Sequence, residues 1–205
     1  MKGKLGFILS VSILLSSVLL LQSCGRNKES MQTYVDSYLG IIKDLKSPTR
    51  VGAIKNGAEA IIAYRKSGFT DIDNAERAKN SLLEGIMLDS ISLLHAKTLK
   101  SPDPVTEEIT RNLLLGVNSA ILGNTIFASN YSKAKDQNIE ERKETILNIR
   151  PGMKYLAEGL NAVVTSMESL QVYIKDNNLK GAEDLEHWYT VFKLENDNIK
   201  GFLKN

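Results

Sequence analysis

The chain has 205 residues, 24% of them charged, and its 26 Lys and Arg exceed its 24 Asp and Glu by two. Lys2 and Lys4 account for that excess, because the first 23 residues contain no acidic side chain. Residues 24–205 are therefore electrically neutral, which removes the electrostatic argument for a nucleic-acid partner. They are numerous enough for one domain with a sizeable core.

The first 23 residues have the composition of a secretory signal. Lys2 and Lys4 precede the uncharged, leucine-rich run Leu5–Leu21, and a small residue, Ser23, stands before Cys24. A basic segment, an apolar segment and a small residue before the cut are typical of such signals. As an uncleaved anchor, Leu5–Leu21 is barely long enough to span a bilayer. We therefore predict a signal segment at residues 1–23.

Leu21-Gln22-Ser23-Cys24 resembles the lipobox of bacterial lipoproteins, although Gln22 departs from its usual small or aliphatic residue. The resemblance implies cleavage before Cys24, a diacylglyceryl group on its sulfur, and acylation of the new N-terminus by a fatty acid such as palmitate. Two or three acyl chains anchor stably, whereas one chain binds only marginally. Cys24 is the only cysteine, so residues 25–205 are expected to contain no disulfide.

The resemblance also implies a place in the bacterial cell envelope, with the membrane as a partner through lipidated Cys24. Gly25 stands where lipoproteins retained in the inner membrane carry Asp. We therefore expect the outer membrane, facing the periplasm, in a cell that has one.

Beyond Cys24 we predict a short polar tether (24–30) and a single helical domain (31–205). The two residues Ser47 and Pro48 read as N-cap and first residue of a second helix, and this short connection predicts an antiparallel hairpin. Asp73 with Glu76, and Asp103 with Pro104, are read as later helix starts. Apolar residues at helical spacing predict helices at 31–46, 48–67, 73–99, 104–132, 139–149, 151–174 and 181–203.

No segment alternates at period two, so the expected class is all-α: six or seven antiparallel helices in an up-and-down bundle or stacked helical hairpins. Met153–Ile174 carries a heptad seam, which fits either a packing face within the bundle or a coiled coil between chains. A helical repeat is a further alternative, but the tetratricopeptide pattern is not found.

Asn112–Ser132 is the longest uncharged stretch of the domain. Its apolar residues point in nearly every direction around a helix, which predicts a helix buried on all sides. Gly116, Ala120 and Asn124 recur every four residues, where small side chains let a neighbouring helix approach. We predict one continuous helix through this stretch, with a bend or break at Gly123-Asn124 as the alternative.

The sequence shows no catalytic constellation, and we expect no metal and no cofactor. A di-iron bundle needs paired Glu-x-x-His motifs, whereas His187 has only Asp184 three residues before it and His95 has Ser92. Ser132-x-x-Lys135 matches a Ser-x-x-Lys spacing that chance explains. We predict that the protein is not an enzyme.

The unusual polar residues are the asparagines of the uncharged stretch, above all Asn118 and Asn124. Buried amides need hydrogen-bond partners, so they either bond to neighbouring helices or line a cavity for a small ligand. Our first hypothesis is a non-enzymatic binding or scaffold module with an unknown envelope partner. The alternatives are a small-ligand carrier with a cavity beside residues 112–132, or a helical-repeat-like accessory component of an envelope complex.

Overall fold

The computed structural model describes residues 27–147 and 149–204. The predicted signal segment 1–23, Cys24 and the first residues of the tether lie outside these described residues. Within them the chain forms helices and turns without any strand, so the predicted all-α class is confirmed. The elements are the N-terminal helix (residues 27–45), α2 (Pro48–Lys66), α3 (Ile72–Lys97), α4 (Pro104–Ser132), α5 (Ile139–Leu147), α6 (Arg150–Asp176) and α7 (Ala182–Lys204).

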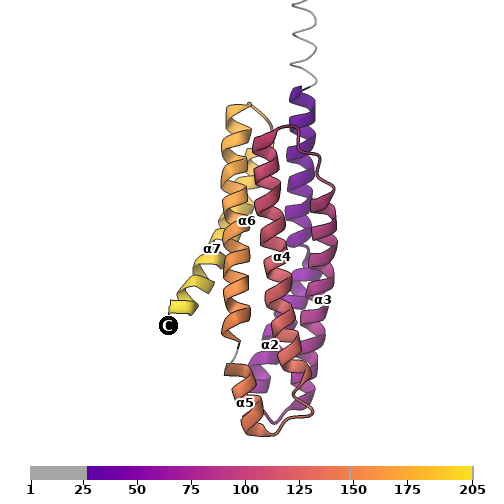
Figure 1. Cartoon of the computed structure of the whole chain (residues 1–205), viewed down its shortest axis with the longest axis vertical. Coiled ribbons are helices and arrows are strands. Elements are labelled where there is room, and N and C mark those ends of the chain that lie inside the picture. The colour runs from indigo at the N-terminus through magenta and orange to yellow at the C-terminus, as the bar shows by residue number, and fades with distance from the viewer. Residues whose placement is uncertain (1–26, 148, 205) are drawn as a thin grey trace, which may run out of the picture.

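The helices form an elongated up-and-down bundle (Figure 1). The N-terminal helix and α2 descend one after the other, α3 rises beside them, α4 descends, α5 lies at the lower end and α6 rises again. α7 begins at the upper end, packs on α6 and then diverges from the bundle toward its C-terminal end. Below, the upper half means the part around the N-terminal helix, and the lower half means the part around α2.

The prediction that residues 31–46 and 48–67 form an antiparallel hairpin is wrong. The two helices point in the same direction (Figure 1), and they meet successive parts of α3: Asp44 contacts His95, and Gly57 lies against Ser81. The reason lies at Ser47, whose φ of −57° and ψ of 145° make it the extended residue that a following proline favours. One extended residue interrupts the helix without reversing the chain.

Two helix starts differ from the prediction. Residues 27–30, assigned to the tether, are already helical, and the Thr33 hydroxyl donates to the carbonyl oxygen of Glu29 at 2.9 Å. α3 is capped by Asp71 rather than Asp73, because Asp71 accepts the hydrogen bond of the Asn74 amide at 3.1 Å. Asp73 instead lies in the first turn of α3, where an acidic side chain favours the helix dipole.

The start of α4 is as predicted, with Asp103 as cap and Pro104 at the first position. One carboxylate oxygen of Asp103 accepts from the Thr106 amide at 2.9 Å, and the other accepts from the Tyr173 hydroxyl of α6 at 2.6 Å. Burial pushes the pKa of Asp103 up, but these hydrogen bonds outweigh it and hold the pKa below its usual value. Burial and the bond to Asp103 both raise the pKa of Tyr173.

The upper half is organised around the N-terminal helix, whose apolar face is buried in the core while Asp36, Lys43 and Asp44 on its other face are exposed. Its tyrosines bond across the core: the Tyr38 hydroxyl lies 2.6 Å from the Ser166 hydroxyl, and Ser166 donates to the Ile109 carbonyl at 3.1 Å. The Tyr34 hydroxyl donates to the Thr106 carbonyl at 3.0 Å. Its buried residues are Tyr34, Val35, Tyr38, Leu39, Ile41, Ile42 and Leu45.

α4 and α6 make the closest contact of the fold, at facing glycines. A Cβ on Gly116 would lie 2.8 Å from the carbonyl oxygen of Gly159, and one on Gly159 would lie 2.7 Å from that of Gly116. This confirms that small residues of α4 admit a neighbouring helix. The seam of residues 153–174 packs into the chain's own core clusters, so within the described structure it is a packing face of the bundle.

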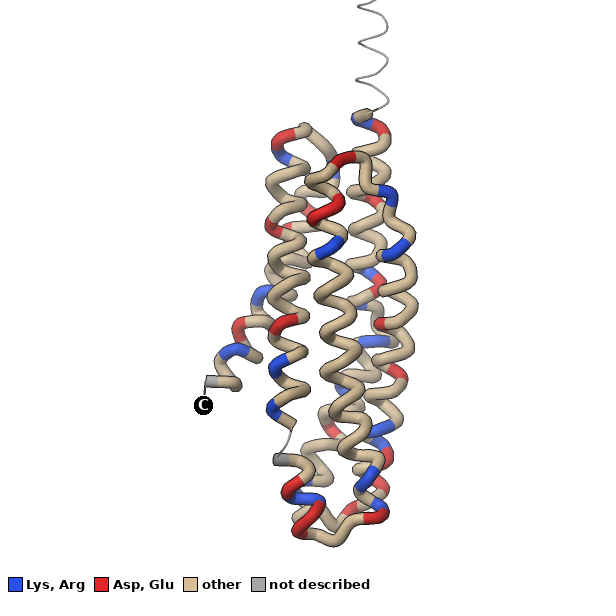
Figure 2. Tube along the Cα trace, viewed as in Figure 1, with Lys and Arg blue, Asp and Glu red and all other residues tan. Residues whose placement is uncertain are grey.

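The prediction that residues 112–132 are buried on all sides is wrong. α4 runs without a break through Gly123-Asn124, and its outer side faces solvent: Leu115 is 56% exposed and Leu122 is 43% exposed. α3 and α6 cover only its flanks. Figure 2 shows that most of α4 carries no charged residue.

α2 also buries a different face from the one its apolar residues indicate. Val51, Ile54 and Ile62 are each about half exposed. The buried residues of α2 are Ala53, Gly57, Ala60 and Tyr64, and three of these have small side chains. Small residues allow α2 to lie close against α3, and this closeness leaves the branched side chains of α2 incompletely covered.

Candidate functional site

The most apolar cavity is a groove between α2 and α7 with a volume of about 390 Å³, which we call the α2–α7 groove. α4 forms its floor and α6 one wall. Its length along the bundle is about 12 Å, since it spans Gly116 to Asn124 on α4. The apolar residues that line it are Leu45, Val51, Ile54, Val117, Ala120, Leu156, Leu160, Val163, Phe192 and Ile199.

The groove exists because two helices move away from each other. α2 leans toward α3, where a Cβ on Gly57 would lie 3.3 Å from the Ser81 Cβ. On the other side α7 leaves the bundle as it descends (Figure 1). Hence the apolar side chains Val51 and Ile54 face open space rather than another helix.

Three charged residues, Lys46, Arg50 and Glu195, line the groove at its rim, and each of the two cations is paired with a carboxylate. The Lys46 ammonium lies 2.6 Å from both carboxylate oxygens of Glu195 and 4.2 Å from the centre of the Phe192 ring. Arg50 binds Asp89, which is 1% exposed, and also donates to the Leu45 carbonyl at 2.7 Å. Buried charges persist in proteins when they are paired in this way.

Lys46 is the more deeply buried partner of its ion pair. Only 6% of its side chain is exposed, whereas 47% of the Glu195 side chain is exposed. Burial lowers the pKa of Lys46, and the bond and charge of Glu195 act in the opposite direction. Since each rim cation already has a carboxylate, the rim favours a neutral or zwitterionic group over a single strong charge.

The structure separates the two asparagines that the sequence analysis singled out. Asn124 is half-buried and lines the α2–α7 groove. Asn118 is exposed on the outer side of α4 and does not line that groove. The cavity beside residues 112–132 is therefore present, but only one of its two predicted residues belongs to it.

Sequence reasoning missed the charged rim. Lys46 and Glu195 are 149 residues apart, and no local motif connects them. The detectable signal was the apolar face of α2 (Val51, Ile54 and Ile62), which was interpreted as core. Its weakness is that periodicity shows which face is apolar and not what covers it.

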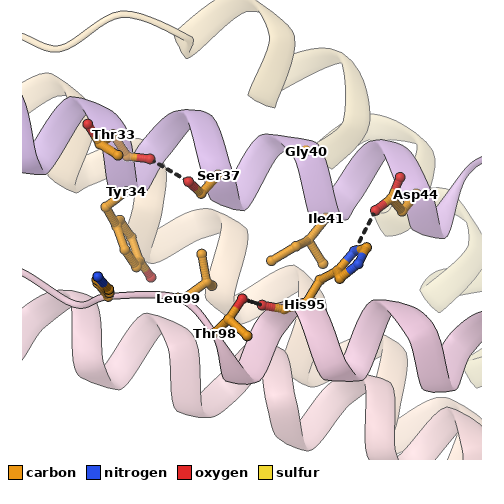
Figure 3. Close-up of a pocket in the computed structure, with 10 residues that line it drawn as sticks. Thr33, Tyr34, Ser37, Gly40, Ile41, Asp44, His95, Thr98 and Leu99 are labelled. Carbon is orange, nitrogen blue, oxygen red and sulfur yellow. Dashed lines mark hydrogen bonds and ion pairs between the residues drawn. The ribbon is translucent and has the colours of Figure 1, made fainter.

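A second hollow, of about 340 Å³, lies between the N-terminal helix and the end of α3 (Figure 3). At one end the Asp44 carboxylate faces the His95 ring, with 3.2 Å between Oδ2 and Nδ1. The Thr98 and Ser37 hydroxyls donate to carbonyl oxygens of their own helices at 2.7 Å. These polar groups already have hydrogen-bond partners within the protein and are less available to a ligand. This hollow is therefore the weaker candidate for a binding site.

The remaining residues considered for chemistry have structural surroundings. The His187 ring packs edge-on against Trp188, with 4.8 Å between the ring centres. Lys135 pairs with Glu76, and the Ser132 hydroxyl donates to a backbone carbonyl of α4. Residues 27–147 and 149–204 contain no group of three or more His, Cys, Asp or Glu placed to hold a metal ion.

None of the described helices has both the length and the hydropathy that crossing a membrane requires. Comparisons of the chain with protein-family models, curated proteins and solved structures found no match.

Proposed function

We propose that this chain is a lipid-anchored protein of the bacterial envelope that acts by binding rather than by catalysis, with the α2–α7 groove as its binding site. The lipobox-like Leu21–Cys24 supports the anchor. The observation that carries the binding role is the groove itself, which is open and lined mainly by apolar side chains. Concave apolar sites with a few polar groups are the usual form of a ligand site.

The chemistry of the groove favours an elongated apolar ligand with a compact neutral or zwitterionic head. Side chains from five elements supply the apolar walls, and the paired charges of Lys46 and Glu195 supply a rim with no net charge. A single-chain lipid has this shape, and each methylene that it buries contributes about 0.8 kcal/mol. This favours the small-ligand carrier over a scaffold that merely presents helix faces.

Labelling in membranes tests the groove. Membranes containing the full chain would be mixed with a photoactivatable lysophosphatidylcholine, a zwitterionic lipid with one acyl chain, and then illuminated. Ile54→Trp fills the groove from a position that is 48% exposed, and we expect it to lower labelling by roughly tenfold through steric exclusion. Ile62→Trp, the same change at a position on α2 outside the groove lining, is the control and should label normally.

Equal labelling of these two variants would contradict the groove as binding site. Competition with an unlabelled fatty acid tests the head group. A fatty acid that competes better than unlabelled lysophosphatidylcholine would contradict the preference for a zwitterion.

The anchor is tested separately. Cells fed a clickable palmitate analogue should label the wild-type chain, and Cys24→Ala should abolish both the label and cleavage of the signal segment. Labelling that persists in Cys24→Ala would contradict the lipobox assignment.

A further inference from the structure

The outer surface of α3 and α4 is a second unexplained feature, separate from the α2–α7 groove. Large apolar side chains on it are 43–62% exposed, and they lie on two helices that pack side by side. We call this surface the α3–α4 face. Its apolar residues are Leu83, Met87, Ile91 and Leu94 of α3, and Leu115 and Leu122 of α4.

The exposed charge among the apolar residues of the α3–α4 face is confined to α3, where Glu84 lies beside Leu83 and Met87. Between Asn112 and Ser132 α4 has no ionisable residue, and Figure 2 shows this uncharged length running down the bundle. The exposed polar residues among the leucines, Asn118 and Thr125, are neutral. Apolar patches larger than a few hundred Å² on a soluble domain mark interaction sites.

This face is compatible with a copy of itself when the two copies place α3 opposite the partner's α4, because the exposed Glu84 of α3 then lies opposite the uncharged length of α4 and meets no like charge there. Two adjacent helices over roughly 20 Å of length give a face on the order of 400 Å² in projection. The accessible area of such a corrugated surface is larger and approaches the ~800 Å² per partner of a standard interface.

We propose that the α3–α4 face binds a second copy of this chain, in a two-fold dimer whose axis runs parallel to the long axis of the bundle. This orientation places both N-terminal helices at the same end. It rests on the proposed anchor, because two chains held through Cys24 in one leaflet must present their upper ends to the same membrane. The choice of the face itself does not depend on the anchor.

The antiparallel register of α3 and α4 fixes which residues meet. Ala75 and Tyr131 line one small pocket, so they lie at the same height. Ile91 lies sixteen residues after Ala75 on α3, and Leu115 lies sixteen residues before Tyr131 on α4. Because the two helices are antiparallel, Ile91 and Leu115 also lie at the same height. A two-fold axis along the bundle keeps height and exchanges the helices, so Ile91 faces the partner's Leu115.

Cysteine cross-linking in membranes tests the arrangement. Cys24 is the chain's only cysteine, so the full chain without an added cysteine sets the baseline. Leu94→Cys, near the upper end of the face, should form cross-linked dimers with a short bis-maleimide. Leu194→Cys on α7, which is equally exposed at 63% against 62%, should stay at the baseline.

A charge exchange then tests the predicted pair. In the Leu94→Cys background, Ile91→Lys places an unpaired cation in the interface and should lower the dimer roughly tenfold, because burying an unpaired charge is strongly unfavourable. Adding Leu115→Glu supplies a carboxylate opposite that lysine and should restore the dimer. Both positions are about half exposed in one copy, and circular dichroism of each variant verifies that the helices are intact.

Two outcomes would overturn the proposal. If Leu94→Cys stays at the baseline, no parallel dimer forms through this face, and a mixture of Leu83→Cys and Leu94→Cys chains that cross-links instead would show antiparallel copies. If Leu115→Glu fails to restore an Ile91→Lys dimer, the two residues do not face each other. Loss of palmitate labelling with Leu94→Cys dimers intact would contradict only the anchor.

Discussion

The upper and lower halves of the bundle use the same kinds of residue with different results. In the upper half the apolar face of the N-terminal helix is buried, and the hydroxyls of Tyr34 and Tyr38 on this face are hydrogen-bonded. In the lower half α2 buries small residues and Tyr64, whose hydroxyl has no partner among the described residues, and leaves Val51 and Ile54 about half exposed. Similar apolar periodicity therefore gives core in one half and a groove wall in the other, because α7 diverges from the bundle as it descends.

The largest expected effect is alkaline unfolding, because burial raises the pKa of tyrosines in both halves, including Tyr131 of the lower half to about 12. Burial raises the pKa of Tyr34 from 10 to about 12 and also raises the pKa of Tyr38 and Tyr173. A pKa raised by folding gives stability that is present below pH 10 and lost as pH rises toward the folded value. For Tyr34 alone the loss is roughly 2 kcal/mol at pH 12 and approaches about 3 kcal/mol above it.

Urea unfolding between pH 9 and pH 12, followed with phenolate absorbance, measures this effect. Tyr34→Phe should remove about 2 kcal/mol of the pH dependence. Stability that is constant up to pH 12 would contradict the expected coupling.

The junction between the halves depends on one buried carboxylate. Asp89 of α3 is 1% exposed and binds Arg50 of α2. Asp89→Asn should lower the free energy of unfolding by about 3 kcal/mol, because it leaves the guanidinium without its counter-charge. Asp44→Asn removes the carboxylate of the exposed Asp44–His95 pair and should cost less than about 1 kcal/mol. Equal losses would show that the Asp89 pair is no more than a surface contact.

Replacing glycine by alanine should lower the free energy of unfolding at one position and raise it at another. Gly116→Ala places a Cβ 2.5 Å from Val163 Cγ2 and 2.8 Å from a backbone oxygen, and we expect a loss of about 2–3 kcal/mol from overpacking. Gly52→Ala in α2 meets nothing within 4 Å and should gain about 0.5–1 kcal/mol through helix propensity. Thermal denaturation of both variants measures the difference. A stabilised Gly116→Ala would mean that α4 and α6 are not in close contact.

The smallest expected effect is a difference in stability between two Tyr→Phe variants. Tyr38→Phe removes a hydrogen bond to Ser166 and should cost about 1 kcal/mol. Tyr64→Phe removes a buried hydroxyl that has no partner among the described residues, and should be neutral or slightly stabilising. Chemical denaturation of the two variants resolves this contrast. A larger loss for Tyr64→Phe would indicate a bridging water at that hydroxyl.

Helix positions and caps were predictable because their causes are local. Ser47-Pro48 and Asp103-Pro104 start helices as expected, since capping depends on residues three or four apart. The direction of α2 was not predictable from the length of its connection, because one extended residue at Ser47 decides it.

The candidate site was predictable only in part. A cavity beside α4 and the involvement of Asn124 follow from unusual polar residues in an apolar helix. The exposure of Asn118 does not, because its surroundings depend on the outer side of α4, which no other described helix covers. Lys46 and Glu195 meet only after α7 has packed, and periodicity carries no information about such distant pairs.

The contacts of the N-terminal helix with distant residues have a consequence for how the chain acquires its structure. Tyr38 bonds to a residue 128 positions away, and Lys46 and Gln32 bond to residues 149 and 148 positions away. α3, α4, α6 and α7 instead contact helices close to them in sequence. Contacts between distant residues form late because closing long loops costs entropy. The first helix to be synthesised is therefore expected to be the last to reach its native surroundings, and a chain cut short before α7 would leave much of its apolar surface uncovered.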